Sequence, residues 1–444
     1  MYNFARRKIT MAMRNITNIL IIAITLAFSA CRANNETDNS SEFVRVENGC
    51  FMVGDSLYRY IGTNFWYGAI LGSEGRGGDR VRLAKELDLL EELGINNLRV
   101  LVGGDGDENI PSHIMPVLQT APGVYNDTIL DGLDYLMAEL ERRNMKAVLF
   151  LNNAWEWSGG YGTYLDWTGA EKTPNPGIDG YDKYMNHVAQ FVKNDSAKAL
   201  AAQHVRNIVS RTNRYTGKPY AESPALMSWQ IANEPRAFAS DSTTKKAFAE
   251  WLAEQAALIK SIDPKHLVST GSEGRHGCEG DMDLWEKIHA DSNIDYAIIH
   301  LWPYNWSWVN ESNLVENVDS ACANAYEYIM PHSEIARRLE KPLVLEEFGY
   351  PRDGFIFTPG SETRGRDKFY EYVFGLVAEN DNIAGCNFWG WGGYAQPAHQ
   401  MWEAWDNYTG DPAQEAQGLN SVFACDSTTM AIIERAASLL KNGK

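Results

Sequence analysis

Eight short apolar runs, each followed by a segment with helical periodicity, constrain the fold of this chain more than any other sequence feature. The intervening segments, such as Ile129–Arg143 and Lys245–Ile262, carry apolar residues at helical spacing. Repeated strand–helix units require a parallel sheet, and eight of them favour a closed barrel. The sequence therefore predicts an α/β fold of the (β/α)8 TIM-barrel class. The expected strands are Tyr58–Phe65, Asn97–Val102, Ala147–Leu151, Leu226–Ala232, Leu267–Thr270, Tyr296–His300, Leu343–Glu347 and Ile383–Trp389.

An open, doubly wound sheet is the alternative arrangement of such units. It normally carries a glycine-rich phosphate-binding turn after its first strand. Here the corresponding loop, residues 72–78, reads Gly-Ser-Glu-Gly-Arg-Gly-Gly and contains neither G-x-G-x-x-G nor G-K-[ST]. We interpret these glycines as residues that allow the loop its shape, and not as a phosphate-binding turn. No linker or internal repeat interrupts the chain after residue 42, so one catalytic domain is expected over residues 43–444.

The first 30 residues have the features of a signal peptide. A basic stretch at residues 6–8 precedes an apolar run, residues 19–27, which is too short to span a membrane comfortably with the ~20 residues that this requires. Small residues before Cys31 resemble a bacterial lipobox, in which the cysteine is lipidated and becomes the mature N-terminus. Phe28 stands where that motif usually has leucine. Ordinary cleavage without a lipid is the alternative.

The segment that follows, residues 31–42, is expected to be a tether. It is rich in Asn, Ser, Asp and Glu and has almost no large apolar residue with which to form a core. An outer-membrane lipoprotein, facing either the periplasm or the cell surface, is the expected location, and secretion is the alternative. The membrane is expected to be a partner only through this lipid anchor.

The net charge of −18 restricts the partners of the folded part. An acidic protein repels nucleic acid and anionic lipid, whereas a neutral polysaccharide is compatible with it. The chain also has 14 Trp and 21 Tyr, whose flat rings suit the faces of sugars as well as a protein core. No C-x-x-C, H-E-x-x-H or G-x-S-x-G motif is present, which argues against zinc and esterase chemistry.

Two glutamates occupy the positions where a barrel carries its chemistry. Glu234 follows the fourth expected strand and Glu347 ends the seventh. The carboxyl ends of all barrel strands meet at one face, so these side chains are expected to face one another across its mouth. Two facing carboxylates are what cleavage of a glycosidic bond needs: one donates a proton, and the other attacks the sugar or activates water. The distance between the two carboxyl groups, which distinguishes direct attack from activation of water, cannot be read from the sequence.

An ordered set of motifs makes the expectation specific. Asn233-Glu234-Pro235 and, later, Glu347-Phe348-Gly349 resemble glycoside hydrolase family 5. Four further stretches resemble its β-mannanase branch, so that the resemblance covers nearly everything from about Val44 to the C-terminus. These stretches are GTNFWY at 62–67, NNAWEWSGG at 152–160, MSWQIANEPR at 227–236 and FWGWGG at 388–393.

The resemblance implies catalytic roles for the two glutamates. Glu234 corresponds to the acid/base and Glu347 to the nucleophile of the family. Glu346 competes for the second role, but adjacent strand residues point to opposite faces, and the family places its nucleophile directly before the aromatic–Gly pair. Asn233 is implied to hold the 2-hydroxyl of the sugar. Arg99 is implied to bond the nucleophile, where its charge would lower the pKa of Glu347.

The resemblance also implies a set of substrate-binding residues. Trp389 corresponds to the floor of the subsite where attack occurs, and His300 ends the sixth strand beside the site. The family usually has His-x-Tyr at this strand end, with the tyrosine bonded to the nucleophile. This chain has Trp302 at that spacing and Tyr304 two residues later, so either residue is a candidate for the tyrosine role. The remaining members of the set are Trp66, Trp155 and Arg236.

The predicted function is that of a retaining endo-β-1,4-mannanase acting on mannan, glucomannan, galactomannan or mannooligosaccharides. An exo-acting mannosidase or mannobiohydrolase, or a glucan-cleaving relative, is the second hypothesis. A surface lipoprotein that binds glycan without cutting it is the third, although both glutamates remain. No cofactor and no metal are expected. The acidic stretch Asp105–Asn109 lacks the glycine of a calcium loop, and we interpret it as solvated.

Overall fold

The computed structural model describes residues 42–110 and 112–442. The predicted signal peptide (1–30), nearly all of the tether and Cys31 lie outside the described residues, so these assignments stay predictions. From Phe43 onward the described chain forms one compact unit. None of its helices has the length and apolar character that a membrane crossing requires.

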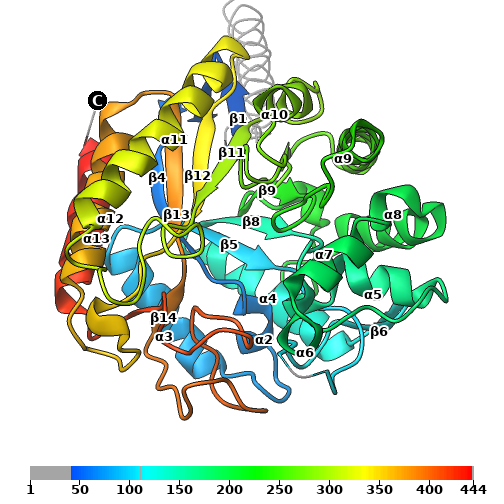
Figure 1. Cartoon of the computed structure of the whole chain (residues 1–444), viewed down its shortest axis with the longest axis horizontal. Helices are drawn as coiled ribbons and strands as arrows, with labels where there is room; N and C mark the ends of the chain where they lie inside the picture. Colours follow the sequence, from blue (N-terminus) through cyan, green and yellow to red (C-terminus); the bar gives the residue numbers. More distant parts are fainter. Residues whose placement is uncertain (1–41, 111, 443–444) are drawn as a thin grey trace, which may run out of the picture. The chain divides into compact units, whose positions relative to one another are not determined.

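Eight strands form the central sheet and confirm the predicted barrel (Figure 1). Every neighbouring pair in the sheet is parallel, and the first and last strands of the barrel, β4 and β13, pair with one another. All eight are buried, as the apolar runs required. In chain order they are β4 (Tyr60–Asn64), β5 (Asn97–Leu101), β8 (Lys146–Phe150), β9 (Leu226–Gln230), β10 (Leu267–Ser269), β11 (Ala297–Leu301), β12 (Leu343–Phe348) and β13 (Ile383–Phe388).

Long helices surround the strands (Figure 1). Several begin with a side-chain cap: Asp79, for example, accepts a hydrogen bond from the backbone N–H of Arg82, and Asp241 accepts one from Thr244. Their bounds are α3 (Arg80–Glu92), α4 (Asp127–Arg142), α8 (Asp195–Val209), α9 (Ser242–Ile262), α10 (Met282–His289), α11 (Val318–Arg338), α12 (Arg364–Glu379) and α13 (Ser427–Asn442).

Short elements lie in the segments between the barrel strands and the long helices. Helix α5 (Gly160–Trp167) was not predicted, because two glycines in its first turn hide its pattern. The hairpin β6 (Gln119–Ala121) and β7 (Val124–Tyr125) follows β5, and the pair β14 (Trp391–Gly393) and β15 (Val422–Phe423) follows β13. The other short helices are α2 (Gly68–Leu71), α6 (Pro176–Asp179) and α7 (Tyr181–Val188), with single 3-10 turns at Glu156–Ser158, Phe191–Lys193, Tyr220–Glu222 and Asp353–Phe355.

A three-stranded antiparallel sheet that the sequence analysis missed precedes the barrel. It consists of β1 (Val44–Glu47), β2 (Cys50–Val53) and β3 (Ser56–Leu57). Its Val44 and Phe51 pack in one apolar cluster with residues from the first halves of barrel strands, among them Val148 of β8 and Val344 of β12. The sheet therefore closes the amino-terminal end of the barrel and leaves the opposite end for chemistry.

Candidate active site

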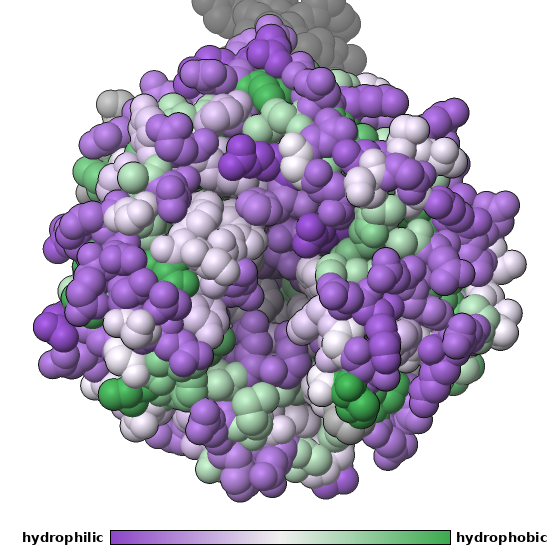
Figure 2. Space-filling model, viewed as in Figure 1, coloured by the Kyte–Doolittle hydropathy of each residue, from purple (hydrophilic) through white to green (hydrophobic). Residues whose placement is uncertain are grey.

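A pocket of 390 Å³ lies at the carboxyl ends of the strands, and both predicted catalytic glutamates line it. Figure 2 shows this face of the molecule hollowed near its centre, with hydrophilic residues around the hollow. The wall combines Trp side chains with polar ones, a mixture that fits a sugar with apolar ring faces and hydroxyl edges. Of the predicted substrate-binding residues, those that line the pocket are Trp155, Asn233, Arg236, Trp302 and Trp389.

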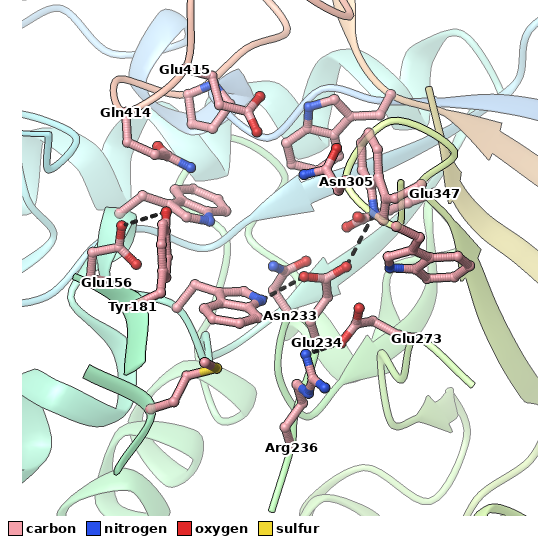
Figure 3. Close-up of a pocket in the computed structure, with 17 residues that line it drawn as sticks. Glu156, Tyr181, Asn233, Glu234, Arg236, Glu273, Asn305, Glu347, Gln414 and Glu415 are labelled. Carbon is pink, nitrogen blue, oxygen red and sulfur yellow. Dashed lines mark hydrogen bonds and ion pairs between the residues drawn. The ribbon is translucent and has the colours of Figure 1, made fainter. Parts of the chain in front are cut away.

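Glu234 lies in the middle of the pocket (Figure 3), just after β9. Its backbone has φ 46°, a left-handed conformation that is uncommon for residues other than glycine. Its N–H donates to the carbonyl of Gly271 (3.0 Å) and fixes this turn. The indole N–H of Trp155 donates to Glu234 Oε2 at 2.6 Å, and that of Trp302 donates to Oε1 at 3.2 Å. These two donors fix the position of the carboxyl group.

Glu347 is buried near the end of β12 and bonded to two cationic side chains. The guanidinium of Arg99 donates to its Oε1, and His300 Nδ1 lies 3.1 Å from its Oε2. Burial alone would raise the pKa of Glu347, but the charges of His300 and Arg99 outweigh it and hold this pKa below its usual value. Glu347 is therefore ionised at neutral pH, as a nucleophile must be.

His300 lies between the two glutamates. Its Nδ1 is 2.9 Å from Glu234 Oε1 and 3.1 Å from Glu347 Oε2. Burial alone would lower the pKa of His300, but its interactions with Glu347 and Glu234 outweigh burial and raise this pKa to about 9. The ring therefore carries a proton at neutral pH. One oxygen of each glutamate and this nitrogen all lie within 4.8 Å of one another. Within the described ranges no other group of His, Cys, Asp or Glu is spaced like metal ligands, but here Arg99 and His300 already supply the countercharge.

Arg99 organises the floor of the site from β5. Besides Glu347, it donates to Gln230 (2.8 Å), to Asn64 (3.0 Å) and to Asn233 Oδ1 (2.8 Å). One N–H of the Asn233 side-chain amide donates to Asn153 Oδ1 at 3.2 Å. This network fixes Asn233 beside Glu234 and leaves no freedom to the guanidinium.

Glu347 lines the pocket and Glu346 does not, as predicted, but simple alternation of side chains along the strand is not the reason. The register between β11 and β12 shifts here, so that Ile299 lies opposite Leu345 while His300 lies opposite Glu347. This bulge leaves Glu346 without a partner residue and interrupts the alternation of side chains. Glu346 is also buried inside the barrel, 3.5 Å from Arg99 Nε, but it does not line the pocket.

Neither candidate for the missing tyrosine role hydrogen-bonds to Glu347. Trp302 lines the pocket but donates to Glu234. Tyr304 lies outside the pocket, where its hydroxyl donates to Glu311 at 3.2 Å and its ring packs on Phe355. Protonated His300 instead occupies the position beside Glu347.

Trp66 and Arg236, both predicted to bind substrate, contact other parts of the protein. Trp66 is buried and does not line the pocket; its indole N–H donates to the carbonyl of Gly410 (2.9 Å), so it supports the segment after β13. Arg236 lines the pocket and lies 3.5 Å from Glu273. Trp389 also lines the pocket, and its indole N–H is buried without a partner in the described structure.

Three acidic pocket residues were not predicted. Glu273 lies four residues beyond the end of β10, just as Glu234 lies four residues beyond β9, so the strand-end rule that found Glu234 would have found it. Burial and the charge of Glu234 raise the pKa of Glu273 to about 8. Burial raises the pKa of Glu156 to about 7. Burial and the charge of Asp411 raise the pKa of Glu415 well above its usual value. Glu415 lies in the long segment after β13, which has no periodic pattern to place it.

Comparison with known proteins agrees with this geometry. The family model described as "GH family 5 beta-mannosidase-like" matches residues 41–444. A protein of Oryza sativa subsp. japonica named "Putative mannan endo-1,4-beta-mannosidase 9" is 26% identical over 389 residues, which cover 84% of this chain and 86% of that protein. "Mannan endo-1,4-beta-mannosidase 3" of Arabidopsis thaliana is 32% identical over 339 residues, 71% and 72% of the two chains.

Solved structures give the same result. The chain is similar to a glycoside hydrolase family 5 mannosidase from Rhizomucor miehei, with a TM-score of 0.82 and 33% identity over 90% of this chain and 98% of the other. A mutant of that enzyme was solved with mannosyl-fructose. An endo-1,4-beta-mannanase from the same organism shares the fold, with a TM-score of 0.68, 23% identity and coverage of 90% and 100%. The chain therefore belongs to glycoside hydrolase family 5, in its β-mannosidase-like group.

Proposed function

We propose that this enzyme cleaves internal β-1,4-mannosidic bonds of mannan, glucomannan or galactomannan by double displacement. The observation that carries the proposal is the closeness of the two carboxyl groups, whose oxygens lie within 4.8 Å of one another. Retaining glycosidases hold their carboxyl groups about 5–5.5 Å apart, whereas inverting enzymes leave room for a water molecule at about 6.5–9.5 Å. The names of the curated relatives and of the solved structures support mannan as the substrate.

In the first step Glu347 attacks the anomeric carbon of the sugar. The glycosidic bond breaks, and Glu234 gives its proton to the departing oxygen. Glu347 is ionised for this step because Arg99 and His300 surround it with positive charge. The Trp155 and Trp302 N–H groups stabilise the carboxylate that Glu234 becomes after it has given its proton away.

In the second step water replaces the leaving group. Glu234, now a carboxylate, removes a proton from the water, whose oxygen attacks the anomeric carbon and displaces Glu347. The sugar leaves with the configuration it had at the start. Asn233, whose side-chain oxygen accepts from Arg99, is proposed to hold the 2-hydroxyl through both steps.

Glu347→Ala tests the proposed mechanism. Turnover of an aryl β-mannoside should fall by several orders of magnitude and recover with added azide, because azide fits the space of the lost carboxylate and attacks directly. NMR should then show an α-mannosyl azide, of inverted configuration. Exposed Glu403, with 67% of its side chain accessible, gives a matched control, and Glu403→Ala should keep full turnover without azide. Failure of azide to rescue Glu347→Ala, with the variant folded, would contradict the assignment of the nucleophile.

Exo action is the second candidate, and one observation favours it. The R. miehei mannosidase superposes with a TM-score of 0.82, whereas the endo-mannanase of the same organism gives 0.68. The products formed from mannan over time distinguish the two. Internal cleavage gives a mixture of oligosaccharide lengths and a rapid loss of viscosity. Exo action releases mannose or mannobiose from the start while viscosity falls slowly. Activity on cellulose alone would identify the enzyme as a glucanase.

We also propose that the protein is exported and anchored by a lipid on Cys31. The support is the sequence pattern of residues 1–31 alone. Cys31→Ala should move the protein from the membrane fraction to the soluble fraction of cells that express the full chain. Exposed Cys425 supplies the matched control, and Cys425→Ala should stay in the membrane fraction. Membrane association that survives Cys31→Ala would exclude the lipid anchor.

A further inference from the structure

Glu273 is a buried carboxyl group near the proposed acid/base, and the two steps of the mechanism do not use it. It lines the catalytic pocket together with Glu234 and is 4% exposed. Figure 3 shows the two carboxyl groups in the same part of the pocket, with the side chain of Arg236 next to them. Arg236 Nη1 lies 3.5 Å from Glu273 Oε2. Glu234 thus has a second acid for a neighbour on this side of the pocket.

Backbone hydrogen bonds between neighbouring strand ends fix the positions of the two glutamates. The N–H of Glu234 donates to the carbonyl of Gly271 at 3.0 Å. The carbonyl of Glu273 accepts from the N–H of His300 at 3.3 Å and from the hydroxyl of Tyr328 at 2.6 Å. Glu273 therefore lies between the segment that carries Glu234 and the strand that carries His300. Because these bonds hold the backbone on both sides, the two carboxyl groups stay near one another.

The charges around Glu273 determine how many protons the two glutamates hold. Two carboxylates buried in one pocket repel each other, so that one of the groups keeps its proton to a higher pH. Burial and the charge of Glu234 raise the pKa of Glu273 to about 8. Arg236 and His300 oppose this rise, and Glu347 adds to it. At neutral pH the two glutamates together therefore keep a proton.

Either glutamate can carry the negative charge while the other carries the proton. An ionised Glu273 faces the guanidinium of Arg236. An ionised Glu234 accepts from the indole N–H groups of Trp155 and Trp302. Glu273 Oε2 has no hydrogen-bond partner in the described structure, so this oxygen is available to hold the proton. Because both ionised forms are stabilised, the proton can change places at a small cost in free energy.

We propose that Glu273 shares one proton with Glu234 and so keeps the proposed acid supplied with a proton before each cleavage. The inference rests on the proposed function. Glu273 acts through Glu234, as a positioning residue for its proton.

The sharing agrees with the balance of charge in both steps. In the first step Glu234 passes the shared proton to the departing oxygen, and both glutamates of the pair are then ionised. Glu347 loses its charge in the same step, because it forms the bond to the sugar, so the number of negative charges in the pocket does not change. In the second step the pair recovers a proton from the attacking water, and Glu347 leaves as a carboxylate.

The pH dependence of two aryl β-mannosides is the first test. The leaving oxygen of phenyl β-mannoside needs a proton, whereas 2,4-dinitrophenyl β-mannoside releases a stable anion and needs none. Glu273→Gln removes the charge that keeps the proton on Glu234, because glutamine cannot ionise. The basic limb of kcat/KM for the phenyl substrate should therefore move to lower pH by about one unit. The basic limb for the dinitrophenyl substrate should stay in place. An unmoved limb for the phenyl substrate, or equal shifts for both, would overturn the proposal.

Two further variants separate the shared proton from the ion pairs of Arg236. Glu279 Oε1 lies 3.5 Å from Arg236 Nε, but Glu279 does not line the pocket. Glu279→Gln should therefore leave the basic limb in place. Glu273→Asp keeps a carboxyl group that can ionise and should restore the limb in part. A shift in Glu279→Gln as large as that in Glu273→Gln would assign the effect to Arg236 and overturn the proposal.

Infrared spectra at neutral pH count the shared proton directly, because a protonated carboxyl group and a carboxylate absorb at different frequencies. If one proton serves two groups, Glu273→Gln and Glu234→Gln should each lose the intensity of one protonated carboxyl group. In each variant the remaining glutamate ionises next to its cation, Arg236 or His300. A loss in one variant alone, or in neither, would show that the proton is not shared.

Glu234→Ala separates this inference from the proposed function. On the proposed mechanism it should lower kcat/KM for phenyl β-mannoside far more than for the dinitrophenyl substrate. Equal losses on the two substrates would overturn the role of Glu234 as the acid, and the sharing of its proton with it. Unequal losses in Glu234→Ala, together with an unmoved basic limb in Glu273→Gln, would overturn the sharing alone.

Discussion

At the scale of single residues, Arg99 determines the charge balance of the site. It is fully buried and contacts Glu347 directly, and it lies 3.5 Å from Glu346. A buried carboxylate that loses one of its two cationic partners is strongly destabilising, because water cannot replace the lost countercharge. The arginine therefore supports both the fold and the ionised state of Glu347, the proposed nucleophile.

Arg99→Met should separate these two contributions. We expect a loss of about 3–5 kcal/mol in the free energy of unfolding and of nearly all activity, because Glu347 and Glu346 are left buried near one another. Urea unfolding and kcat measure the two effects. Arg99→Lys restores the charge but not the geometry that reaches Asn233, so it should recover stability in part and activity hardly at all. Equal recovery of both in the lysine variant would refute a role for the guanidinium geometry.

The pH dependence of stability is a second consequence at this scale. The pKa of His300 is raised to about 9 in the folded protein, above the value of about 6.5 in the unfolded chain. Protonated His300 therefore stabilises the fold fully below about pH 6.5, and this contribution disappears as the pH rises through 9. The difference in unfolding free energy between wild type and His300→Gln should shrink by roughly 3 kcal/mol over this interval. A difference that is constant with pH would show that the ring is neutral.

At the scale of elements, the strands of the barrel were predictable because parallel strands buried on both faces read as unbroken apolar runs. The sequence gives no such signal for β1–β3, which are short strands that pair with one another and whose apolar side chains pack against strands far away in the sequence. The bulge beside Glu346 and Glu347 is also invisible in sequence, since it depends on pairing with β11. Trp66 and Tyr304 were predicted to bind substrate but contact other protein groups. Their positions in a motif do not determine the direction in which their side chains point.

The sheet β1–β3 should contribute stability without taking part in catalysis. Phe51 is fully buried against Tyr296 at the amino-terminal end of the barrel. Phe51→Ala should lower the free energy of unfolding by about 3–5 kcal/mol, through lost burial and the cavity that remains. Below its melting temperature the variant should keep the kcat and KM of wild type, because the site is at the other end of the barrel. A change in KM would show that the floor of the barrel is coupled to the pocket.

At the scale of the whole molecule, the net charge of −18 matches a neutral polymer rather than a charged one. Binding of an uncharged chain releases no counterions, so it lacks the steep salt dependence of charged ligands. The KM for mannan should change less than about twofold between roughly 0.05 and 0.5 M NaCl. Initial rates on soluble galactomannan measure this. A steep rise of KM with salt would indicate that a charged polysaccharide is the better substrate.

The backbone of Glu234 has a thermodynamic consequence of its own. A left-handed conformation at φ 46° costs a residue with a Cβ roughly 1–2 kcal/mol, which glycine would avoid. Glu234, the proposed proton donor, is thus held in a backbone conformation that glycine would adopt at a lower cost in stability. On the proposed mechanism, this turn therefore gives up some stability so that a carboxyl group can stand in the pocket.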